Sequence, residues 1–387
     1  MLDSFLRQVT KDSYGPVAFN QKTSFPWVVH KFQEAFSLFG FGRMPDAIGS
    51  RGKINAFLFS KFNFAIQSQA SWTQFLKSPD ALVFRKAGTS IQQSGNVSSS
   101  LNELAETFPM RNNFVGAIDE QCFKELDQKI PLTPDRFLAP QFFDGSREVV
   151  PMVYPVCEFI SEEKIPVSTV MGRAVWNYSI FRETNGAKPL PFEFLCHYRL
   201  TEQSIKRLKT DSISLPKSAS LQTLLAGTTW DFPVIELLLA QNPFEKRVGL
   251  SEAIWMTGLS PEFFQKAILT AAWASAFMRF RIKNLQMNAI KIRLGVHTDG
   301  SLMLLDNFTL DDLYLEKDGR SFHLDSAQEF YQKTSWHESV EHAKKHAETV
   351  GLPDWKRLIA EPVPFLDVKV KLKLEADQQE LLKCLSE

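Results

Sequence analysis

The chain has 387 residues, and its 44 lysines and arginines balance 44 aspartates and glutamates, so its formal net charge at pH 7 is zero. A chain without net charge has no overall field to attract nucleic acid or an anionic membrane, so we expect neither as a partner. Four dispersed cysteines without metal-ligand spacing, no signal peptide, and no apolar run of about 20 residues indicate a cytoplasmic protein without disulfides.

The first 67 residues predict a strand, a glycine-rich loop and a helix, in that order. Residues 27–32 (WVVHKF) have the aromatic and β-branched composition of a strand. The loop carries glycines and the cations Arg43, Arg51 and Lys53, and such a loop presents backbone amides and positive charge to an anion. An ordinary connector has the same composition, so both interpretations stay open. Residues 53–67 repeat apolar side chains every three to four positions, which predicts an amphipathic helix.

The middle of the chain predicts mainly strands. Within the segment PFEFLCHYR, Glu193 and His197 are four positions apart, so the alternation of a strand would put both on one face. The apolar residues after Trp230 predict a further strand that leads into a polar loop. The remaining expectations are strands at 80–85 and 149–160, a surface loop at 88–100, a short helix capped by Ser100 and Glu103, and a helix at 201–211.

Residues 288–312 predict a β-hairpin followed by three carboxylates. Two apolar, β-branched runs flank His297-Thr298-Asp299-Gly300, and the Asp-Gly step supplies the positive φ angles of a tight turn. Asp306, Asp311 and Asp312 follow the second strand within seven residues. Aspartates are both ordinary turn formers and ligands of Mg²⁺, so a solvated turn and a cation site are both open here.

The last third predicts two helices and a strand. Apolar residues have helical spacing from Pro261 to about residue 286, and Pro favours the first helical turn. Residues 335–351 form a second predicted helix, with Ser335 and Glu338 as its capping box and Gly351 as its end. In FLDVKVKLKLE, apolar and polar residues alternate strictly from Leu366 to Leu374, which predicts a half-buried edge strand. Helices and strands mixed without a βαβ rhythm indicate the α+β class.

Several segments, in this order, resemble one enzyme family. RQVTKDSYGP resembles the pattern Arg-Gly-Ser-x-Lys-Asp-x-Tyr, and the loop segment FGFGRMPDAIGSRGK resembles Asp-Trp-Gly-x-Met-Pro-Asp-x-Ile-x-x-Lys-Gly. PLPFEFLCHYRL is similar to a Pro-Leu-Glu-Val-x-x-Arg strand, and FPVIELLLAQNPFEKR is similar to Pro-x-Ile-Glu-Phe-x-Thr-Lys. The predicted hairpin resembles an Asp-x-Lys-x-Glu strand and the acidic strand after it. The family is SAICAR synthetase (phosphoribosylaminoimidazole-succinocarboxamide synthase), and the resemblance covers about residues 4–358.

The resemblance implies a two-part α+β fold related to ATP-grasp enzymes, with a lid-like domain at 1–188 and a larger domain at 189–387. It also implies the family reaction of purine biosynthesis, in which ATP and Mg²⁺ drive the ligation of carboxyaminoimidazole ribotide (CAIR) with aspartate. Carried over position by position, the implied site consists of Lys291 and Asp306 as catalytic residues, Lys11, Arg51, Lys53 and Lys291 on ATP, Asp306 and Asp311 on Mg²⁺, and Asp46, His197, Arg199, Ser204 and Lys206 on the substrate.

Other positions depart from the family pattern. Gln8 stands where the resemblance implies a glycine, Ala240 and Asn242 where it implies a lysine and a glutamate, and Arg293 where Asp-x-Lys-x-Glu ends in an acid. An arginine in place of a carboxylate changes the local charge by two, and one unit pair at about 4 Å is worth about 4 kcal/mol at an effective dielectric near 20. These departures weaken the expectation of ATP and Mg²⁺ binding, and they predict reduced, altered or lost activity.

Two hypotheses therefore stay open. The first is a ligase that acts on CAIR or a related small-molecule nucleotide. The second is a catalytically degenerate paralogue that acts as a protein-interaction or regulatory partner, as a homo-oligomer or in a complex with an active relative.

Overall fold

The structure is a computed structural model, and it describes most of the chain. The described residues are 4–7, 11–17, 19, 25–82, 110–144, 150–160, 165–179, 181, 187–202, 204–205, 227–240, 246–282, 284–305 and 308–386. The predicted loop at 88–100 and the predicted cap at Ser100–Glu103 lie outside these residues, as does most of the predicted helix at 201–211.

The first sheet is antiparallel, with the strand order β1-β2-β3-β7-β6. Its strands are β1 (Ser4–Arg7), β2 (Lys11–Tyr14), β3 (Trp27–Phe32), β7 (Val153–Glu158) and β6 (Phe114–Asp119). The predicted strands at 27–32 and 149–160 are thereby confirmed. Helix α1 (Arg51–Gln67) packs on this sheet, as the spacing predicts, but it is buried on nearly all sides instead of along one stripe. Its polar Ser60 and Asn63 donate hydrogen bonds to carbonyls one turn earlier, both at 2.8 Å, which makes their burial tolerable.

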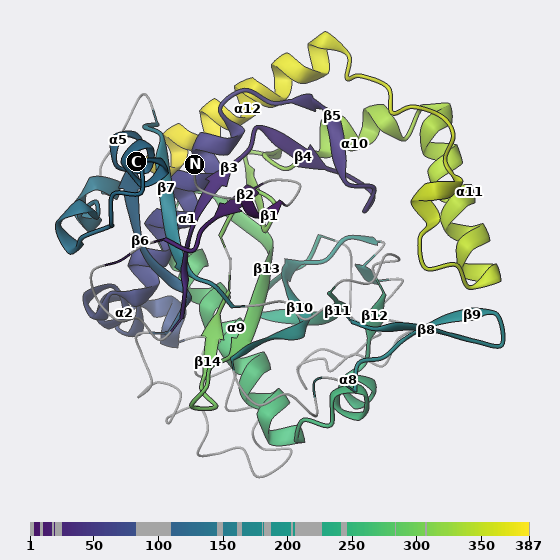
Figure 1. The fold of residues 1–387 in the computed structure, drawn as a ribbon, viewed down its shortest axis with the longest axis horizontal. Coiled ribbons are helices and arrows are strands. Elements are labelled where there is room, and N and C mark those ends of the chain that lie inside the picture. The colour runs from purple at the N-terminus through teal and green to yellow at the C-terminus, as the bar shows by residue number, and fades with distance from the viewer. Residues whose placement is uncertain are drawn as a thin grey trace.

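The second sheet is also antiparallel and has the order β12-β11-β10-β13-β15-β16, with β14 paired to β13. Its strands are β10 (Lys188–Arg199), β11 (Thr229–Leu239), β12 (Arg247–Val248), β13 (Gln286–Val296), β14 (Leu302–Leu304), β15 (Leu313–Lys317) and β16 (Arg320–Ser321). Helix α9 (Pro261–Arg281) packs on one face and ends about five residues earlier than predicted. The β13–β14 pairing confirms the predicted hairpin. One apolar core joins α1, α9 and both sheets (Figure 1).

The other elements surround the two sheets. They are the hairpins β4 (Ala35–Ser37) with β5 (Arg43–Ala47) and β8 (Val167–Val170) with β9 (Arg173–Trp176), the helices α2 (Gln69–Leu76), α5 (Glu120–Asp127), α8 (Leu250–Thr257), α10 (Asp325–Tyr331), α11 (Ser335–Val350) and α12 (Val368–Ser386), and the 3₁₀ turns η1 (Pro134–Arg136), η2 (Pro140–Phe143) and η3 (Trp355–Leu358). Figure 1 shows the β8–β9 hairpin projecting from the sheets towards the lower end of α11.

Two local features differ from the sequence prediction, and one agrees with it. Residues 79–82 are helical, so the strand predicted from residue 80 is wrong over its described part. Thr334, not Ser335, caps α11, because its side chain accepts the hydrogen bond from the His337 N–H at 3.3 Å. Gly351 ends the helix in the left-handed region with φ of 75°, as expected.

The strand predicted at the C-terminus is wrong, because residues 368–386 form helix α12. Leu366, Val370 and Leu374 are four residues apart, and a spacing of four satisfies both the period of a strand and that of a helix. Leu366, just before the helix, and Val370 and Leu374 within it pack inward, while Val368 and Leu372 face solvent. The residues after 375 distinguish the helix from the strand, because the buried Leu381 and Leu382 continue the helical spacing.

Two leucines of α12 provide a direct stability test of this register. Leu374 is 2% exposed and Leu372 is 59% exposed. We expect Leu374→Ala to lower the free energy of unfolding by about 2–4 kcal/mol, because it leaves a cavity, and Leu372→Ala to change it by less than about 0.5 kcal/mol. Urea denaturation of both variants measures the difference. Equal losses would contradict the helical register, because a strand would bury both side chains alike.

Candidate functional site

One face of the second sheet gathers charged side chains at its centre. The antiparallel register of β10 and β13 sets Glu193 opposite Arg293, Leu195 opposite Lys291, and His197 opposite Ala289. Alternate residues of the same strands, such as Cys196 and Ile290, lie in the apolar core that contains α9. Glu193 and His197 therefore share one face, as the sequence predicted, and that face faces away from α9.

Lys291 is held against the acidic turn that follows β14. Its backbone N–H donates to the Asp312 carbonyl at 2.9 Å, next to the pair that Ile290 of β13 forms with Leu313 of β15. Burial lowers the pKa of Lys291, but Tyr314, Glu193, Asp312 and Asp311 together raise it more, so the net pKa lies above its ordinary value. The ammonium group is therefore a fixed positive charge at neutral pH. We call Glu193, Lys291, Asp311 and Asp312 the lysine site.

Asp312 closes the acidic turn with its own side chain. Its Oδ2 accepts hydrogen bonds from the Thr309 N–H at 2.9 Å and the Thr309 hydroxyl at 2.8 Å. The neighbouring Leu310 N–H donates to the Asn55 side-chain carbonyl at 2.9 Å, which ties the turn to α1. Asp312 thus acts as a turn former, one of the two interpretations that the sequence left open.

The side chain of Asp311 binds Arg51 at the start of α1. The Arg51 guanidinium donates to Asp311 Oδ1, and the two side chains are 3% and 29% exposed. The second oxygen of Asp311 and the Nε of Arg51 are buried, and neither has a hydrogen-bond partner among the described residues. Two residues that the resemblance assigns to Mg²⁺ and to ATP are therefore bound to each other. Asp306, the other implied Mg²⁺ ligand, lies outside the described residues.

The glycine-rich loop before α1 has two of its backbone amides bound by carboxylates of the chain itself. Glu34 Oε2 accepts from the Gly52 N–H at 2.8 Å, and Glu375 Oε1 of α12 accepts from the Gly49 N–H at 3.2 Å. Gly52 has no room for a side chain, since a Cβ there would lie 2.7 Å from the Phe32 carbonyl oxygen. Two amides of the loop thus bind anionic groups, one of the two interpretations that the sequence left open, but these anions belong to the protein.

Asp46 has a contact that the sequence did not predict. Its Oδ2 accepts from the Leu366 N–H at 2.7 Å, so this implied substrate-binding residue holds the segment that leads into α12. Lys11 lies in the first sheet, buried, with its ammonium group 6.0 Å from the centre of the Phe59 ring. Lys53 lies in the first turn of α1.

Two further contacts with carboxylates occupy the implied substrate-binding residues of β10. His197 Nε2 lies 3.3 Å from Glu236 Oε2, and the same oxygen accepts from Arg247 Nε at 3.0 Å. Arg199 pairs with Glu316 at 3.0 Å. The Ser204 N–H donates to the Thr201 hydroxyl at 3.1 Å, and Lys206 lies outside the described residues.

Glu236 is a site-face residue that the sequence analysis did not single out. It is the one charged residue in the apolar run VIELLL of β11, and its side chain is fully buried. An acid inside an apolar strand needs a cationic partner to be stable there. That rule would have identified the position, although it could not have named Arg247 and His197 as the partners.

The site face also carries a small apolar cluster. Leu195, Leu238 and Ala289 are buried there, with Tyr314 packed against them. The Tyr314 ring stacks on His323 with the ring centres 4.3 Å apart. Ala289 and Tyr314 stand where the resemblance implies an acid and an arginine, so this part of the face is apolar in the present chain.

Searches of the described residues find neither a metal cluster nor a membrane span. No group of three or more histidines, cysteines, aspartates or glutamates is arranged to hold a metal ion in that part of the chain. None of the described helices is long and apolar enough to cross a membrane. All four cysteines are free and buried.

The pKa of Asp312 predicts a pH dependence of stability. Burial raises it to about 6, against the opposing effects of Lys291 and the Thr309 hydrogen bonds. Because the folded chain binds this proton more tightly than the unfolded chain, the stabilising contribution is complete below about pH 4 and is lost as the pH rises through about 6. We expect a loss of about 1–3 kcal/mol over this range, measured by urea denaturation. Asp312→Asn, which keeps an acceptor for Thr309, should remove this component, and an unchanged profile would contradict the assignment.

The comparisons with known proteins point to a single family. No protein-family model matches the chain. Over 213 residues, or 54% of the chain, it is 22% identical to a protein of Archaeoglobus fulgidus named "Putative phosphoribosylaminoimidazole-succinocarboxamide synthase". The match spans 62% of the length of that relative. The similarity is to the family that the sequence motifs resemble.

Solved structures of SAICAR synthetases resemble the chain only at low identity and at TM-scores below 0.5. SAICAR-synthase from Saccharomyces cerevisiae, complexed with SAICAR, is 11% identical, with a TM-score of 0.49 and coverage of 100% of this chain and 95% of that chain. A SAICAR synthetase (type-2) in complex with ADP is 13% identical, with a TM-score of 0.43 and coverage of 90% and 97%. The bound SAICAR and ADP belong to those two complexes, and similarity this low does not carry them over to the present chain.

Proposed function

We propose that the chain is a SAICAR synthetase-like protein of purine biosynthesis whose lysine site binds a nucleotide and whose ligase activity is reduced, altered or lost. The sequence similarity to the Archaeoglobus fulgidus protein and the ordered motifs support the family. The family reaction joins CAIR to aspartate, and its ATP-dependent chemistry requires cations on phosphate and carboxylates on Mg²⁺.

The observation that carries the nucleotide-binding part is the position of Lys291. Lys291 carries a fixed positive charge on β13, the strand that resembles Asp-x-Lys-x-Glu. It lies beside the turn that bears Asp311 and Asp312. A lysine ammonium group binds phosphate oxygens as a point charge. Asp311 Oδ2, which is buried without a hydrogen-bond partner among the described residues, is an oxygen suited to Mg²⁺.

The residues present fit Mg·ATP, although one oxygen of the Asp311 carboxylate already binds Arg51. Mg²⁺ takes one or two carboxylates and keeps several waters, so Asp311 together with Asp306 would hold it. Lys291, with Lys11, Arg51 and Lys53, would hold the phosphates, while His197, Arg199, Ser204, Lys206 and Asp46 remain the proposed substrate-binding residues. When bound, Mg·ATP supplies the phosphoryl group that activates a carboxylate towards an amine.

Three features of the site support reduced or altered catalysis. Arg51 is bound to Asp311, so a phosphate has to compete with a carboxylate for its guanidinium. Glu34 and Glu375 occupy amides of the glycine-rich loop. Arg293 lies opposite Glu193 at a position where the family pattern has an acid. Each of these reduces the positive potential or the carboxylate ligands available to Mg·ATP.

Thermal unfolding with ATP, Mg²⁺ and both together tests the proposal. A ligand present at 100 times its Kd stabilises the folded state by about 2.7 kcal/mol, so millimolar Mg·ATP should raise the melting temperature by several degrees. Lys291→Met should abolish the rise, while Lys369→Met on the exposed side of α12 should leave it unchanged. The absence of any rise with the unmodified chain would refute nucleotide binding.

Direct assay of the ligation tests the second part of the proposal. Incubation with CAIR, aspartate and Mg·ATP, followed by chromatography, should give no product or turnover far below the typical enzyme value of about 10 per second. Turnover at that value would refute reduced activity and restore the working-ligase hypothesis.

A second candidate function, protein interaction, is favoured by one feature of α12. Val368 and Leu372 are exposed one turn apart on α12, and Phe365 is exposed in the segment just before the helix. We call these three residues the apolar stripe. We take a second copy of the chain as the partner, because a homodimer requires no other protein. Sedimentation equilibrium should then show a dimer that Leu372→Glu dissociates, and a monomer at all concentrations would exclude this role for the stripe.

A further inference from the structure

One tryptophan exposes most of its apolar side chain to solvent, which does not contribute to the stability of the fold. Trp255, in α8, is 75% exposed although its neighbours Ile254 and Met256 pack against the core. It lines a cavity of about 880 Å³, within the size range of small-molecule sites. The cavity contains none of the residues of the lysine site. We call it the aromatic cavity.

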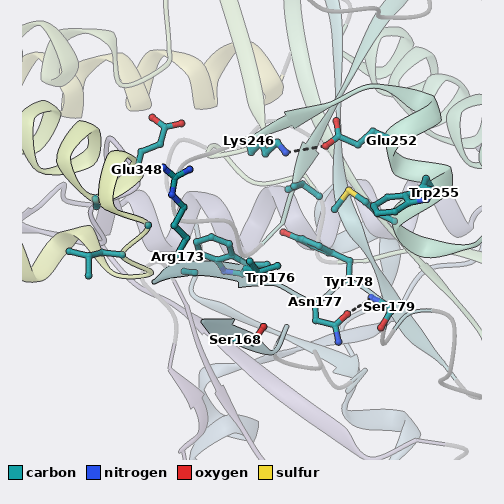
Figure 2. Close-up of a pocket in the computed structure, with 17 residues that line it drawn as sticks. Ser168, Arg173, Trp176, Asn177, Tyr178, Ser179, Lys246, Glu252, Trp255 and Glu348 are labelled. Carbon is teal, nitrogen blue, oxygen red and sulfur yellow. Dashed lines mark hydrogen bonds and ion pairs between the residues drawn. The ribbon is translucent and has the colours of Figure 1, made fainter. Parts of the chain in front are cut away.

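The aromatic cavity is built from three segments that are distant in sequence. Trp176 and Tyr178 come from the end of the β8–β9 hairpin, Trp255 comes from α8, and Glu348 comes from the last turn of α11 (Figure 2). Aromatic side chains on several walls favour a ligand with a flat ring, because rings stack or pack edge to face.

Backbone contacts fix two of the walls, the β8–β9 hairpin and the end of α11, relative to each other. The Ala174 N–H of β9 donates to the Gly351 carbonyl at the end of α11 at 2.7 Å. The approach is so close that a Cβ on Gly351 would lie 2.6 Å from the Arg173 Cα. The Asn177 N–H donates to the Pro166 carbonyl at 2.8 Å, which closes the base of the hairpin. A cavity with walls fixed in this way loses little conformational entropy when a ligand binds.

The charges around the cavity consist of one satisfied pair and two separate charges. Lys246 and Glu252 bind each other at 3.0 Å. Arg173 and Glu348 are both exposed, and neither forms an ion pair within the described part of the chain. Among the described residues, one cation and one carboxylate on the same cavity thus have no ion-pair partner, which matches a ligand that carries both an anionic and a cationic group.

We propose that the aromatic cavity binds an aromatic zwitterion, a molecule with one or two flat rings, an ammonium group and a carboxylate, of which a free aromatic amino acid is the simplest example. Its ring packs against Trp255 and Trp176, its carboxylate binds Arg173, and its ammonium group binds Glu348. The site is separate from the proposed nucleotide site and does not depend on it.

Three related probes separate the contributions of the two charges. L-Tryptophan carries both charged groups, tryptamine lacks the carboxylate, and indole-3-propionate lacks the ammonium group. In calorimetric titration of the full chain, L-tryptophan should bind one site with a Kd of about 1 mM or below, and each of the other two should bind at least about fivefold more weakly. Equal binding of the three probes would overturn the proposal, and so would the absence of saturable binding of L-tryptophan up to about 5 mM, about five times the expected Kd.

Matched variants then assign each charge to its residue. Arg173→Gln should weaken L-tryptophan and indole-3-propionate but not tryptamine, whereas Glu348→Gln should weaken L-tryptophan and tryptamine but not indole-3-propionate. Trp255→Ala should weaken all three probes. Arg357→Gln and Glu341→Gln are the controls, since both residues are exposed and lie outside the cavity. Circular dichroism establishes that each variant is folded. If the variants and their controls behave alike, the assignment is wrong.

Discussion

Replacing Arg247 by methionine should lower the free energy of unfolding by about 3 kcal/mol. The side chain of Glu236 is 0% exposed, and its Oε2 lies between Arg247 Nε at 3.0 Å and His197 Nε2 at 3.3 Å. A buried carboxylate that loses one cationic partner keeps its desolvation penalty, and such losses amount to about 3–5 kcal/mol. His197 remains as a second partner, so we expect the lower end of that range. Urea denaturation at pH 7 measures the loss.

A double variant distinguishes a lost ion pair from lost packing. Arg247→Met combined with Glu236→Met replaces the pair by apolar side chains of similar length, and such replacements are often neutral or stabilising. We therefore expect the double variant to recover at least half of the stability that the single variant loses. If both variants are equally unstable, the arginine contributes through its packing and not through its charge. If Arg247→Met costs less than about 0.5 kcal/mol, the pair has no structural importance.

Local patterns were sufficient to predict the elements whose signals lie within one segment. The hairpin at residues 288–305 was predictable because an Asp-Gly turn and two apolar strands are adjacent in sequence. The end of α11 at Gly351 was predictable for the same reason. The α12 helix was not, because the spacing from Leu366 to Leu374 suits both a strand and a helix, and the lysines between them suit an exposed face in either case.

Burial and pairing were harder to predict, because they depend on residues far apart in the chain. Helix α1 has an amphipathic sequence, yet a sheet, α9 and α12 all contact it, so its polar face is buried too. Arg51 and Asp311 were both singled out, one for ATP and one for Mg²⁺, but nothing in the sequence indicates that two residues 260 positions apart bind each other. The sequence therefore singled out both side chains as candidates, but it could not indicate that they are paired with each other.

Substitutions in the Arg51–Asp311 ion pair should change both the stability of the fold and the binding of ligands. Arg51→Met should destabilise the fold by about 2–3 kcal/mol, because it leaves Asp311 with a buried carboxylate oxygen and only partial access to water. Asp311→Asn should cost less, since a neutral amide can still accept a hydrogen bond from the guanidinium. Denaturation of the two single variants and the double variant gives the coupling energy, which we expect to exceed about 1 kcal/mol. Independent effects would show that the pair is not formed in solution.

Ligand binding by the same variants decides what the pair does in the proposed nucleotide site. If Asp311 competes with phosphate for Arg51, Asp311→Asn replaces the anionic partner of the guanidinium by a weaker neutral one, and ATP without Mg²⁺ should bind about tenfold more tightly. If Asp311 is also a Mg²⁺ ligand, the same variant should lose the extra stabilisation that Mg²⁺ adds to ATP in thermal unfolding. We expect both results, because Asp311 Oδ1 contacts Arg51 while its Oδ2 has no hydrogen-bond partner among the described residues. An unchanged affinity for ATP in Asp311→Asn would place the nucleotide away from Arg51, and the ion pair would then serve only to hold α1 to the acidic turn.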